Sequence, residues 1–312
     1  MLHEISFPSS NDRDQVTGWV YVPACEPEGV VQLIHGFGEH SRRYFHMIVA
    51  LMDAGFIVAA DDHVGHGATA IANGTWGDWG DAGPHTMMED EKRFKDLVCE
   101  KYPDLPYFLF GHSMGSFVVR AYLARHAEGL AAAVICGTGT QPLALSKAGS
   151  FLARRIAASK GEDYRSAFLD GLGAGAFAKQ IENARTPFDW LSTDPAVVDA
   201  YIADEMCGAM FSAGGYATLT DLTGEVVTHA CAAKVPHDLP VLFVAGAEDP
   251  VGGCGKGVHA AAELLRGAGV RRVDEVLYPG MRHEILNEPG RAQVYADIAQ
   301  WMEEHACEKP TS

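Results

Sequence analysis

The sequence has few basic residues and no long apolar run. Lysine and arginine number 24 against 41 aspartate and glutamate residues, which gives a formal net charge of −17. We therefore expect no nucleic-acid partner, because phosphate binding needs a basic surface. The longest apolar stretches, such as 130–136, are too short to cross a bilayer. The first residues lack a basic segment followed by an apolar one, so no secretory signal is expected.

Paired cysteines are also lacking. Seven cysteines are scattered along the 312 residues, and no two of them form a C-x-x-C pair. An odd, scattered set argues against a disulfide framework and against a structural zinc site. We therefore expect a protein of the reducing cytoplasm.

Short apolar runs alternate with segments of helical spacing. Runs of this kind are typical of strands buried in a parallel sheet, and they cover residues 30–34, 56–60, 107–110, 131–136 and 241–245. Residues 5–7 and 18–22 indicate an antiparallel hairpin at a sheet edge. The predicted fold class is α/β, with a mostly parallel sheet and helices on both faces.

The alternation stops between residues 141 and 233. This stretch has no clean strand run, and it contains short helical patterns and a bend at Gly171, Gly173 and Gly175. We predict a core formed by residues 1–140 and 234–312, with residues 141–233 inserted as a helical cap.

The strongest local motif is Gly111-His112-Ser113-Met114-Gly115, which follows an apolar run and precedes a helical pattern. G-x-S-x-G in this position is a nucleophile elbow. The serine must stand on a tight, strained turn, and glycine two residues to either side avoids collisions with the strand and the helix. The helix N-terminus that follows favours a developing oxyanion.

A serine hydroxyl needs a base, and in this fold the chain order is serine, acid, histidine. Asp249 follows the run 241–246 and is preferred over Glu248, because Pro250 ends the run and the shorter side chain holds an imidazole more rigidly. His283 follows the strand pattern 273–278 and is the expected base. The other late histidine, His305, is expected to be solvated at the end of the last helix.

The oxyanion hole needs a second N–H group from the loop after an early strand. The run 30–34 leads into His35-Gly36-Phe37. The N–H groups of Phe37 and Met114 are therefore expected to form the hole, each contributing on the order of 3 kcal/mol to transition-state stabilisation. His35 is expected to shape the loop rather than to act as a catalyst.

With these motifs, the sequence resembles the monoacylglycerol lipase and lysophospholipase branch of the α/β-hydrolases. The matching pieces are H-G-F-G-E-H-S at 35–41 with Arg43-Tyr44, D-H-V-G-H-G at 62–67, the serine motif, the acid loop 246–251 and Y-P-G-M-R-H-E at 278–284. The resemblance implies a triad of Ser113, Asp249 and His283, a helical cap, and no cofactor. Ala68-Thr69 departs from the polar residue and serine that usually follow D-H-x-G-H-G.

A possible metal site and one cysteine need separate interpretation. Asp61, Asp62, His63 and His66 resemble metal ligands, but the family match makes them a loop that shapes the wall of the site, so no metal is expected. Cys254 lies five residues past Asp249, and its role is left open between a perturbing thiol and a packing residue.

The expected cap contains two apolar sets. One set either lines an acyl pocket or forms the cap's own core: Phe168, Phe177, Met206, Met210, Phe211 and Tyr216. In the segment 146–160, Ala148, Phe151, Leu152 and Ile156 recur at helical spacing with Lys147, Arg154, Arg155 and Lys160 beside them. This helix either packs on the core or meets a lipid surface.

The sequence thus predicts a serine hydrolase that cleaves carboxylic esters of a small-molecule or lipid substrate. The alternatives are an esterase for short or aromatic acyl groups, an aminopeptidase with Asp204 or Glu205 binding the amine, and a binding protein without catalysis. The oligomeric state is not predicted.

Overall fold

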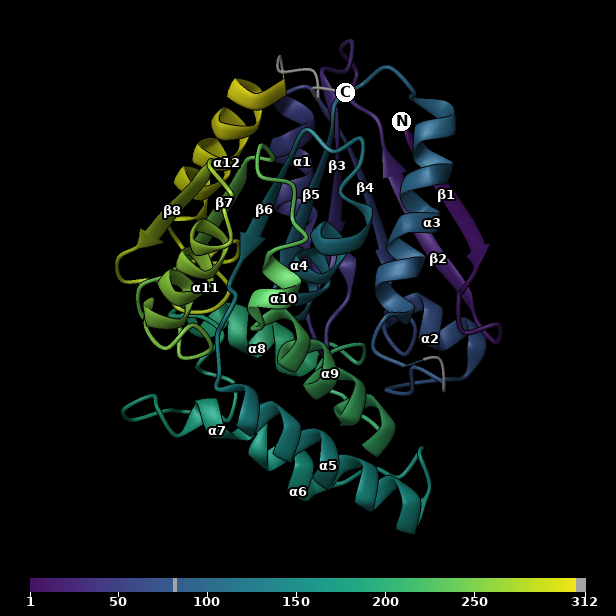
Figure 1. Ribbon diagram of the computed structural model, residues 1–312, viewed down its shortest axis with the longest axis vertical. Helices are drawn as coiled ribbons and strands as arrows, with labels where there is room; N and C mark the ends of the chain where they lie inside the picture. Colours follow the sequence, from purple (N-terminus) through teal and green to yellow (C-terminus); the bar gives the residue numbers. More distant parts are fainter. Residues whose placement is uncertain (81–82, 307–312) are drawn as a thin grey trace.

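The computed structural model describes residues 1–80 and 83–306 (Figure 1). Within these residues the strands form one eight-stranded sheet in the order β1-β2-β4-β3-β5-β6-β7-β8. The strands are β1 (Leu2–Pro8), β2 (Gln15–Tyr21), β3 (Gly29–Ile34), β4 (Phe56–Asp62), β5 (Tyr107–His112), β6 (Ala132–Cys136), β7 (Val241–Gly246) and β8 (Val273–Tyr278).

The register confirms the predicted mostly parallel sheet and its edge hairpin. β1 pairs antiparallel with β2, and β2 pairs antiparallel with β4. The pairs from β4 through β3, β5, β6 and β7 to β8 are all parallel. Every residue of β3, β5, β6 and β7 is buried, which explains their unbroken apolar runs, whereas the outer strand β8 alternates.

Helices cover both faces of the sheet (Figure 1). One face packs against α3 (Thr86–Lys101), α4 (Met114–His126) and α11 (Lys256–Gly267), and the other packs against α1 (Phe45–Asp53) and α12 (Arg291–Ala306). The short helix η1 (Ser41–Tyr44) precedes α1 in the chain, and α2 (Gly67–Asn73) follows β4. This is the layered architecture expected from the strand and helix alternation.

The stretch between β6 and β7 is helical. It comprises α5 (Leu143–Lys160), α6 (Ala167–Leu172), α7 (Ala174–Ala178), α8 (Pro195–Ala203), α9 (Ala213–Val226) and α10 (His229–Ala232). Figure 1 shows α5 to α9 gathered at one end of the sheet. No helix in the described residues has the length and apolar character needed to span a membrane.

Helices α5 and α9 pack closely through small residues. The buried side of α5 consists of Ser146, Ser150, Ala153 and Ala157. A Cβ added at Gly224 of α9 would lie 3.0 Å from the Ser146 Cβ, so the two backbones leave no room for larger side chains. The large apolar residues of α5 therefore point elsewhere, and Phe151 is 68% exposed.

Candidate active site

Ser113 stands on a strained turn between β5 and α4. Its φ and ψ are 53° and −117°, a conformation that non-glycine residues rarely adopt. A Cβ at Gly111 would lie 2.3 Å from the Gly115 carbonyl oxygen, and one at Gly115 would lie 2.1 Å from that of Ile34. Both glycines are therefore required sterically, and the turn directs Ser113 into a cavity that it lines.

Asp249 and His283 lie in the loops that follow β7 and β8. The His283 Nδ1 is 2.9 Å from the Asp249 Oδ2, and both residues are buried. The other carboxylate oxygen accepts the Val251 N–H at 2.8 Å. Because the carboxylate is an acceptor, Nδ1 carries the proton, and Nε2 is left with its lone pair available to a proton donor.

The His283 ring is held between two other rings. The centroid of its ring lies 5.1 Å from that of Trp190 and 4.7 Å from that of His112. His283 and Ser113 line the same cavity. Within the described chain the Ser113 hydroxyl has no hydrogen-bond partner. Catalytic hydrogen bonds of this kind are often long without substrate and tighten when it binds.

The loop after β3 passes close to the nucleophile. A Cβ at Gly36 would lie 3.0 Å from the Ser113 Cβ. The Gly36 N–H donates to the Glu39 Oε1 at 2.8 Å. Phe37 and Met114, the residues expected to supply the oxyanion hole, both line the cavity, and Met114 opens α4, where helix N–H groups lack intrahelical partners.

His35 shapes this loop, as expected. Its Nδ1 is 2.8 Å from the Gly36 carbonyl oxygen, and its Nε2 is 3.1 Å from the His63 N–H. The first contact needs a proton on Nδ1 and the second needs a lone pair on Nε2, so one neutral tautomer satisfies both. Burial lowers the pKa of His35 well below its usual value, which keeps the ring in this form.

A buried charged cluster behind the site was missed from the sequence. Arg43 donates to both oxygens of Glu284, at 2.5 and 2.8 Å, and to the Glu39 Oε2 at 2.7 Å. Glu284 directly follows His283, and Glu39 anchors Gly36. Both glutamates belong to motifs that the sequence analysis identified. Their charge inside those motifs was the sequence feature that could have indicated the cluster.

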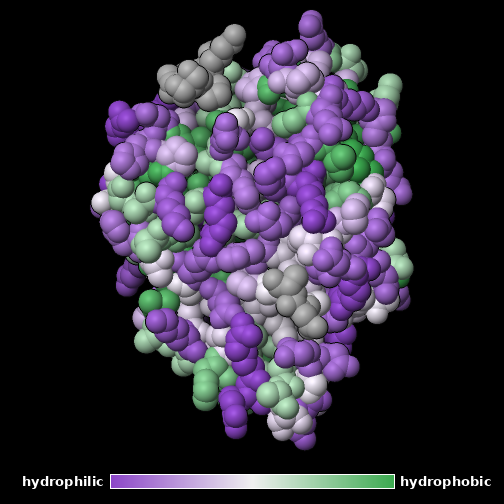
Figure 2. Space-filling model, turned by 45° about the vertical axis from the view of Figure 1, so that its right-hand side comes forward, coloured by the Kyte–Doolittle hydropathy of each residue, from purple (hydrophilic) through white to green (hydrophobic). Residues whose placement is uncertain are grey.

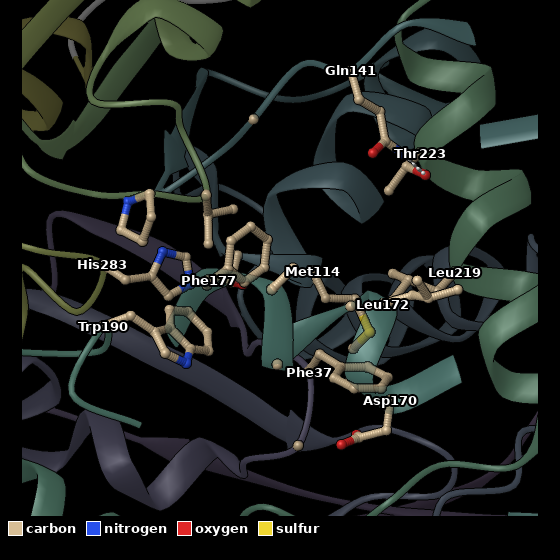
Figure 3. A pocket seen from close by; sticks show the side chains of 18 of the residues that line it. Phe37, Met114, Gln141, Asp170, Leu172, Phe177, Trp190, Leu219, Thr223 and His283 are labelled. Carbon is tan, nitrogen blue, oxygen red and sulfur yellow. Dashed lines mark hydrogen bonds between the residues drawn. The ribbon is translucent and has the colours of Figure 1, made fainter. Parts of the chain in front are cut away.

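The cavity has a volume of about 930 Å³ and a mostly apolar lining (Figure 3). In Figure 3, His283, Trp190 and Phe177 gather at one end, and Leu172 and Leu219 lie at the other. Residues of the expected core and of the expected cap line it together. The described charged residues along it are Glu39, Asp170, Lys256 and Glu284.

The six cap residues expected to line a pocket or pack together do not act as one set. Phe177 and Tyr216 line the cavity. Phe168 is 61% exposed, because α6 turns Leu169, Asp170 and Leu172 toward the cavity and Phe168 away from it. Phe211 is buried behind the lining, with its ring 4.0 Å from that of Phe37. Among the described residues, Met206 and Met210 do not line the cavity either.

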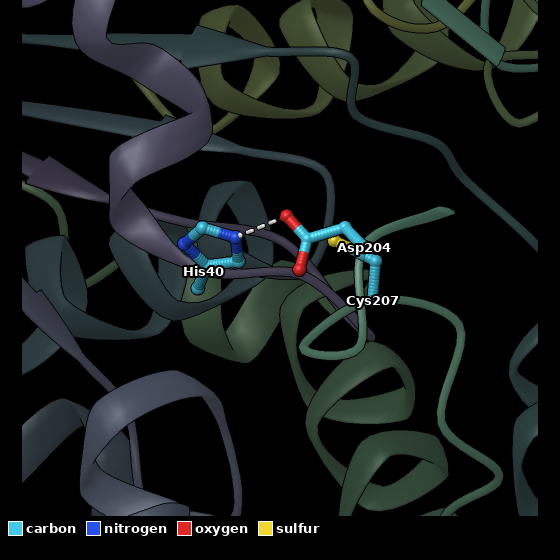
Figure 4. Close-up of side chains that lie close together, drawn as sticks. All are labelled: His40, Asp204 and Cys207. Atoms are coloured by element: carbon cyan, nitrogen blue, oxygen red, sulfur yellow. Dashed lines mark hydrogen bonds and ion pairs between the residues drawn. The ribbon is translucent and has the colours of Figure 1, made fainter. Parts of the chain in front are cut away.

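Asp204 and Glu205, considered as amine-binding residues, do not line the cavity in the described structure. The Asp204 Oδ2 is 3.0 Å from the His40 Nε2, beside Cys207 (Figure 4). Its other oxygen accepts the Met206 N–H. Glu205 is exposed. Asp170 is the acid of the expected cap that reaches the cavity, where it accepts a hydrogen bond from the Tyr216 hydroxyl at 2.6 Å.

Two groups of residues in the described chain have the ligand types of a metal site: His40-Asp204-Cys207, and Asp61-His63-Glu91. Burial raises the pKa of the Cys207 thiol, so this sulfur stays protonated. Burial likewise raises the pKa of Asp61 well above its usual range and that of Glu91 to about 8. The raised pKa values favour neutral carboxyl groups here, while both Asp61 oxygens, the Glu91 Oε1 and the His63 Nδ1 have no hydrogen-bond partner among the described residues.

The prediction for His305 was wrong, and the structure adds to what was left open for Cys254. His305 is buried instead of solvated, with its ring centroid 4.2 Å from that of Trp301. Cys254 is exposed, has a φ of 53°, and donates its N–H to the Asp249 carbonyl oxygen at 2.8 Å. Its backbone thus braces the acid loop, while its side chain is open to solvent.

The strained serine, the adjacent Asp249–His283 pair and the sheet together define an α/β-hydrolase. The chain belongs to the family described as "Serine aminopeptidase, S33", whose sequence model matches residues 25–290.

Known relatives agree with this assignment. The monoacylglycerol lipase of Mycolicibacterium smegmatis is 31% identical over 295 residues, which is 92% of each chain. A thermostable carboxyl esterase from Bacillus coagulans, solved with glycerol, has a TM-score of 0.93 at 40% identity and covers 98% of this chain and 99% of its own. A structure described as an open-form lipase has a TM-score of 0.91 at 37% identity, with 99% and 100% covered. These findings confirm the predicted α/β-hydrolase fold and the ester-hydrolase class.

Proposed function

We propose that this chain hydrolyses carboxylic esters through an acyl-enzyme on Ser113. The observation that carries the proposal is the 2.9 Å Asp249–His283 hydrogen bond beside a strained serine in one apolar cavity. The carboxylate fixes the imidazole tautomer and stabilises the imidazolium that forms during the reaction.

In the first half-reaction the His283 Nε2 accepts the Ser113 proton while the Ser113 oxygen attacks the ester carbonyl carbon. The N–H groups of Phe37 and Met114 stabilise the oxyanion. When the tetrahedral intermediate collapses, its ester bond breaks and the leaving alcohol takes the proton from His283. A water molecule then attacks the acyl-enzyme, gives its proton to His283, and releases the acid as that proton returns to Ser113.

The proposed substrate is a monoacylglycerol or a similar acyl ester. The largely apolar cavity suits an acyl chain, and Asp170 with Tyr216 supplies polar groups for the alcohol part. Relatives described as monoacylglycerol lipase and carboxyl esterase support this choice. A short-chain or aromatic ester remains the first alternative, because the cavity volume alone does not fix the chain length.

Aminopeptidase activity is the second candidate, and the carboxylate of Asp170 is the observation that favours it. Glu39 and Glu284 share an ion pair with Arg43, whereas Asp170 accepts a hydrogen bond from the Tyr216 hydroxyl and has no ion pair among the described residues. A free carboxylate in an apolar cavity can bind an ammonium group or a diol. If an amine binds there, Asp170→Asn should abolish cleavage of amino-acid anilides.

The test compares nitrophenyl esters of rising chain length with amino-acid anilides, using wild type and Ser113→Ala. We expect ester hydrolysis that is lost in Ser113→Ala, with a preference for medium or long acyl chains. Faster anilide cleavage would favour the aminopeptidase. Turnover of neither substrate by folded protein would favour the third alternative, a binding protein without catalysis.

We also propose that residues 141–233 act as a cap over a core of residues 1–140 and 234–312. Residues from α5, α6, α7 and α9 line the cavity together with Ser113 and His283, which belong to the core, and this supports the division.

The six cysteines in the described residues are all free, which supports a reducing cytoplasmic location.

Peripheral contact with a lipid surface is a further part of this proposal. Leu145, Phe151, Phe168 and Leu172 are 57–68% exposed, and Leu145 and Leu172 also line the cavity. Lys147 and Arg155 are exposed on the same helix as Phe151. On the face in Figure 2 the apolar side chains at this end of the molecule are interspersed with hydrophilic ones, so any contact is shallow.

Liposome co-sedimentation tests this contact. We expect binding to anionic vesicles that weakens in Phe151→Ser, with Ile71→Ser, at a similarly exposed apolar residue on α2, as the matched control. Absence of wild-type binding at every lipid composition would refute it.

A further inference from the structure

His112, the residue before Ser113, lies in a buried network that the proposed reaction does not use. Its ring centroid is 4.7 Å from that of His283. Gly137 has a φ of +59°, and a Cβ there would lie 3.0 Å from the His112 Nε2 and 3.2 Å from the His283 Cε1. A side chain at this position would crowd both histidine rings and strain the backbone, so glycine leaves the two rings their space.

The protons of this network can be counted from its acceptors. The His112 Nε2 is 3.1 Å from the His283 carbonyl oxygen, which only accepts, so Nε2 carries a proton. The Tyr44 hydroxyl lies 2.8 Å from the His112 Nδ1 and 2.5 Å from the Glu39 Oε1. A phenol has one proton and a carboxylate has none. The phenol proton therefore points to Glu39, and Nδ1 must donate to the phenol oxygen.

This count requires an ionised Glu39. Its Oε1 also accepts the Gly36 N–H, and its Oε2 accepts the Arg43 guanidinium. Burial alone would raise the pKa of Glu39, but the hydrogen bond with His112 and the Arg43 charge hold it well below the usual range. Moving the proton from His112 to Glu39 would leave a neutral carboxyl facing Arg43, which costs the charge-assisted bond.

We propose that His112 is a positioning residue that acts as an imidazolium, tying the backbone of His283 to Glu39 and, through Glu39, to Gly36. The base loop, the nucleophile turn and the oxyanion loop are then joined by one protonated ring. This inference rests on the proposed function and adds a second ionisable histidine to it.

The charges around His112 favour this state. The groups that face it come from the loop after β3 and η1 (Glu39, Arg43, Tyr44), from β6 (Cys136), from the loop after β7 (Asp249, through His283) and from the loop after β8 (His283, Glu284). Burial raises the pKa of Tyr44 and of Cys136 well above their usual values, so both are neutral. The three carboxylates of Glu39, Asp249 and Glu284 thus face a single guanidinium, that of Arg43. This excess of negative charge favours a positively charged His112 ring.

The pH dependence follows from the sign of the shift. Burial opposes the charged ring, but the hydrogen bond and charge of Glu39 raise the pKa of His112 above its ordinary value. A group of this kind contributes its stabilisation fully below the ordinary histidine pKa, and the contribution is lost as pH rises through the raised value. Activity should therefore fall on an alkaline limb as His112 loses its proton.

NMR of the imidazole nitrogens in ¹⁵N-labelled Ser113→Ala protein tests the assignment without any need for activity. The His112 signals are identified by their loss in Ser113→Ala/His112→Gln. We expect protons on both ring nitrogens at pH 7 and the loss of one at alkaline pH. A single protonated nitrogen at pH 7 would overturn the proposal.

A pH–rate comparison tests the positioning role. Tyr44→Phe removes the hydroxyl that bridges His112 and Glu39 and leaves only their 3.5 Å ion pair, so its alkaline limb should move to lower pH and kcat/KM at pH 8 should fall about tenfold or more. Tyr278→Phe is the matched control, because the Tyr278 hydroxyl also donates to a carboxylate, that of Asp297. Its profile should match wild type. An unchanged alkaline limb in Tyr44→Phe would contradict the role.

The two measurements separate the two proposals. A doubly protonated His112 in a chain that hydrolyses no ester would refute the proposed function alone. A neutral His112 in an active esterase would refute this inference alone.

Discussion

Arg120 links α4 to both ends of the helical stretch between β6 and β7. The guanidinium is buried and donates to the Thr138 Oγ1 at 3.3 Å, the Gly139 carbonyl oxygen at 3.0 Å and the Val226 carbonyl oxygen at 2.9 Å. Replacing Arg120 with methionine keeps an apolar stem but leaves two buried carbonyl groups without a donor.

The net effect is a balance of two free energies. Each unsatisfied buried carbonyl costs about 1–3 kcal/mol. Against this, methionine removes a buried charge, and burial lowers the pKa of Arg120 from its ordinary value to about 10, which corresponds to roughly 3 kcal/mol of unfavourable desolvation. Two such carbonyls cost about 2–6 kcal/mol together, so we expect Arg120→Met to lower the free energy of unfolding by at most about 3 kcal/mol.

The larger effect should be on substrate choice. Thr140 and Val227, next to the residues that Arg120 binds, line the cavity. Releasing both connections should raise KM for long-chain esters several-fold and leave short-chain esters nearly unaffected. Urea unfolding and a nitrophenyl ester series measure the two effects.

Arg266→Met is the control for this prediction. Arg266 is part-exposed and also donates to a backbone carbonyl, that of Val273, but it lies outside the cavity lining. We expect less than about 1 kcal/mol of destabilisation and an unchanged ester profile. The reasoning is refuted if Arg120→Met matches this control in both assays.

Two further predictions concern the proposed acid and the buried acid pair. Asp249→Asn should keep the fold but favour the wrong His283 tautomer, so kcat on a medium-chain ester should fall about 10⁴-fold, and a loss below tenfold would contradict the acid role. For Glu91, the raised pKa of about 8 stabilises the folded state fully below its ordinary value near 4.5, and this contribution is lost as pH rises through 8. In urea unfolding, the free energy of unfolding of Glu91→Gln relative to that of wild type should therefore be higher at pH 8 than at pH 5, by up to a few kcal/mol. The same difference between variant and wild type at both pH values would refute the assignment.

The sheet was predictable because buried parallel strands are recorded in the sequence as unbroken apolar runs. The same runs pointed to Ser113, Asp249 and His283 as the expected triad, because functional side chains in this fold follow strand ends. The glycines around Ser113 were informative for a steric reason that the structure bears out at Gly111 and Gly115.

Helical periodicity was less informative in residues 141–233. It marked an apolar face on α5, but it did not show that small residues pack against α9 while Phe151 faces solvent. Periodicity gives the direction of a side chain relative to its neighbours, and tertiary packing decides what lies in that direction. The same limit explains why Phe168 points away from the cavity.

The buried charges depended on long-range contacts that no local pattern contains. Arg43 and Glu284 are 241 residues apart, and His112 and His283 are 171 apart. Their motifs were visible in the sequence. The pairing of these side chains, however, depends on how the loops are arranged at the sheet edge.

The most direct test of the account is covalent labelling with a fluorophosphonate, followed by peptide mass spectrometry. Wild type should carry one adduct, on the peptide that contains Ser113. Ser113→Ala should remain unlabelled, while the buried-serine control Ser150→Ala should label like wild type. Labelling of folded Ser113→Ala at the wild-type rate, or an adduct elsewhere in wild type, would contradict the central claim.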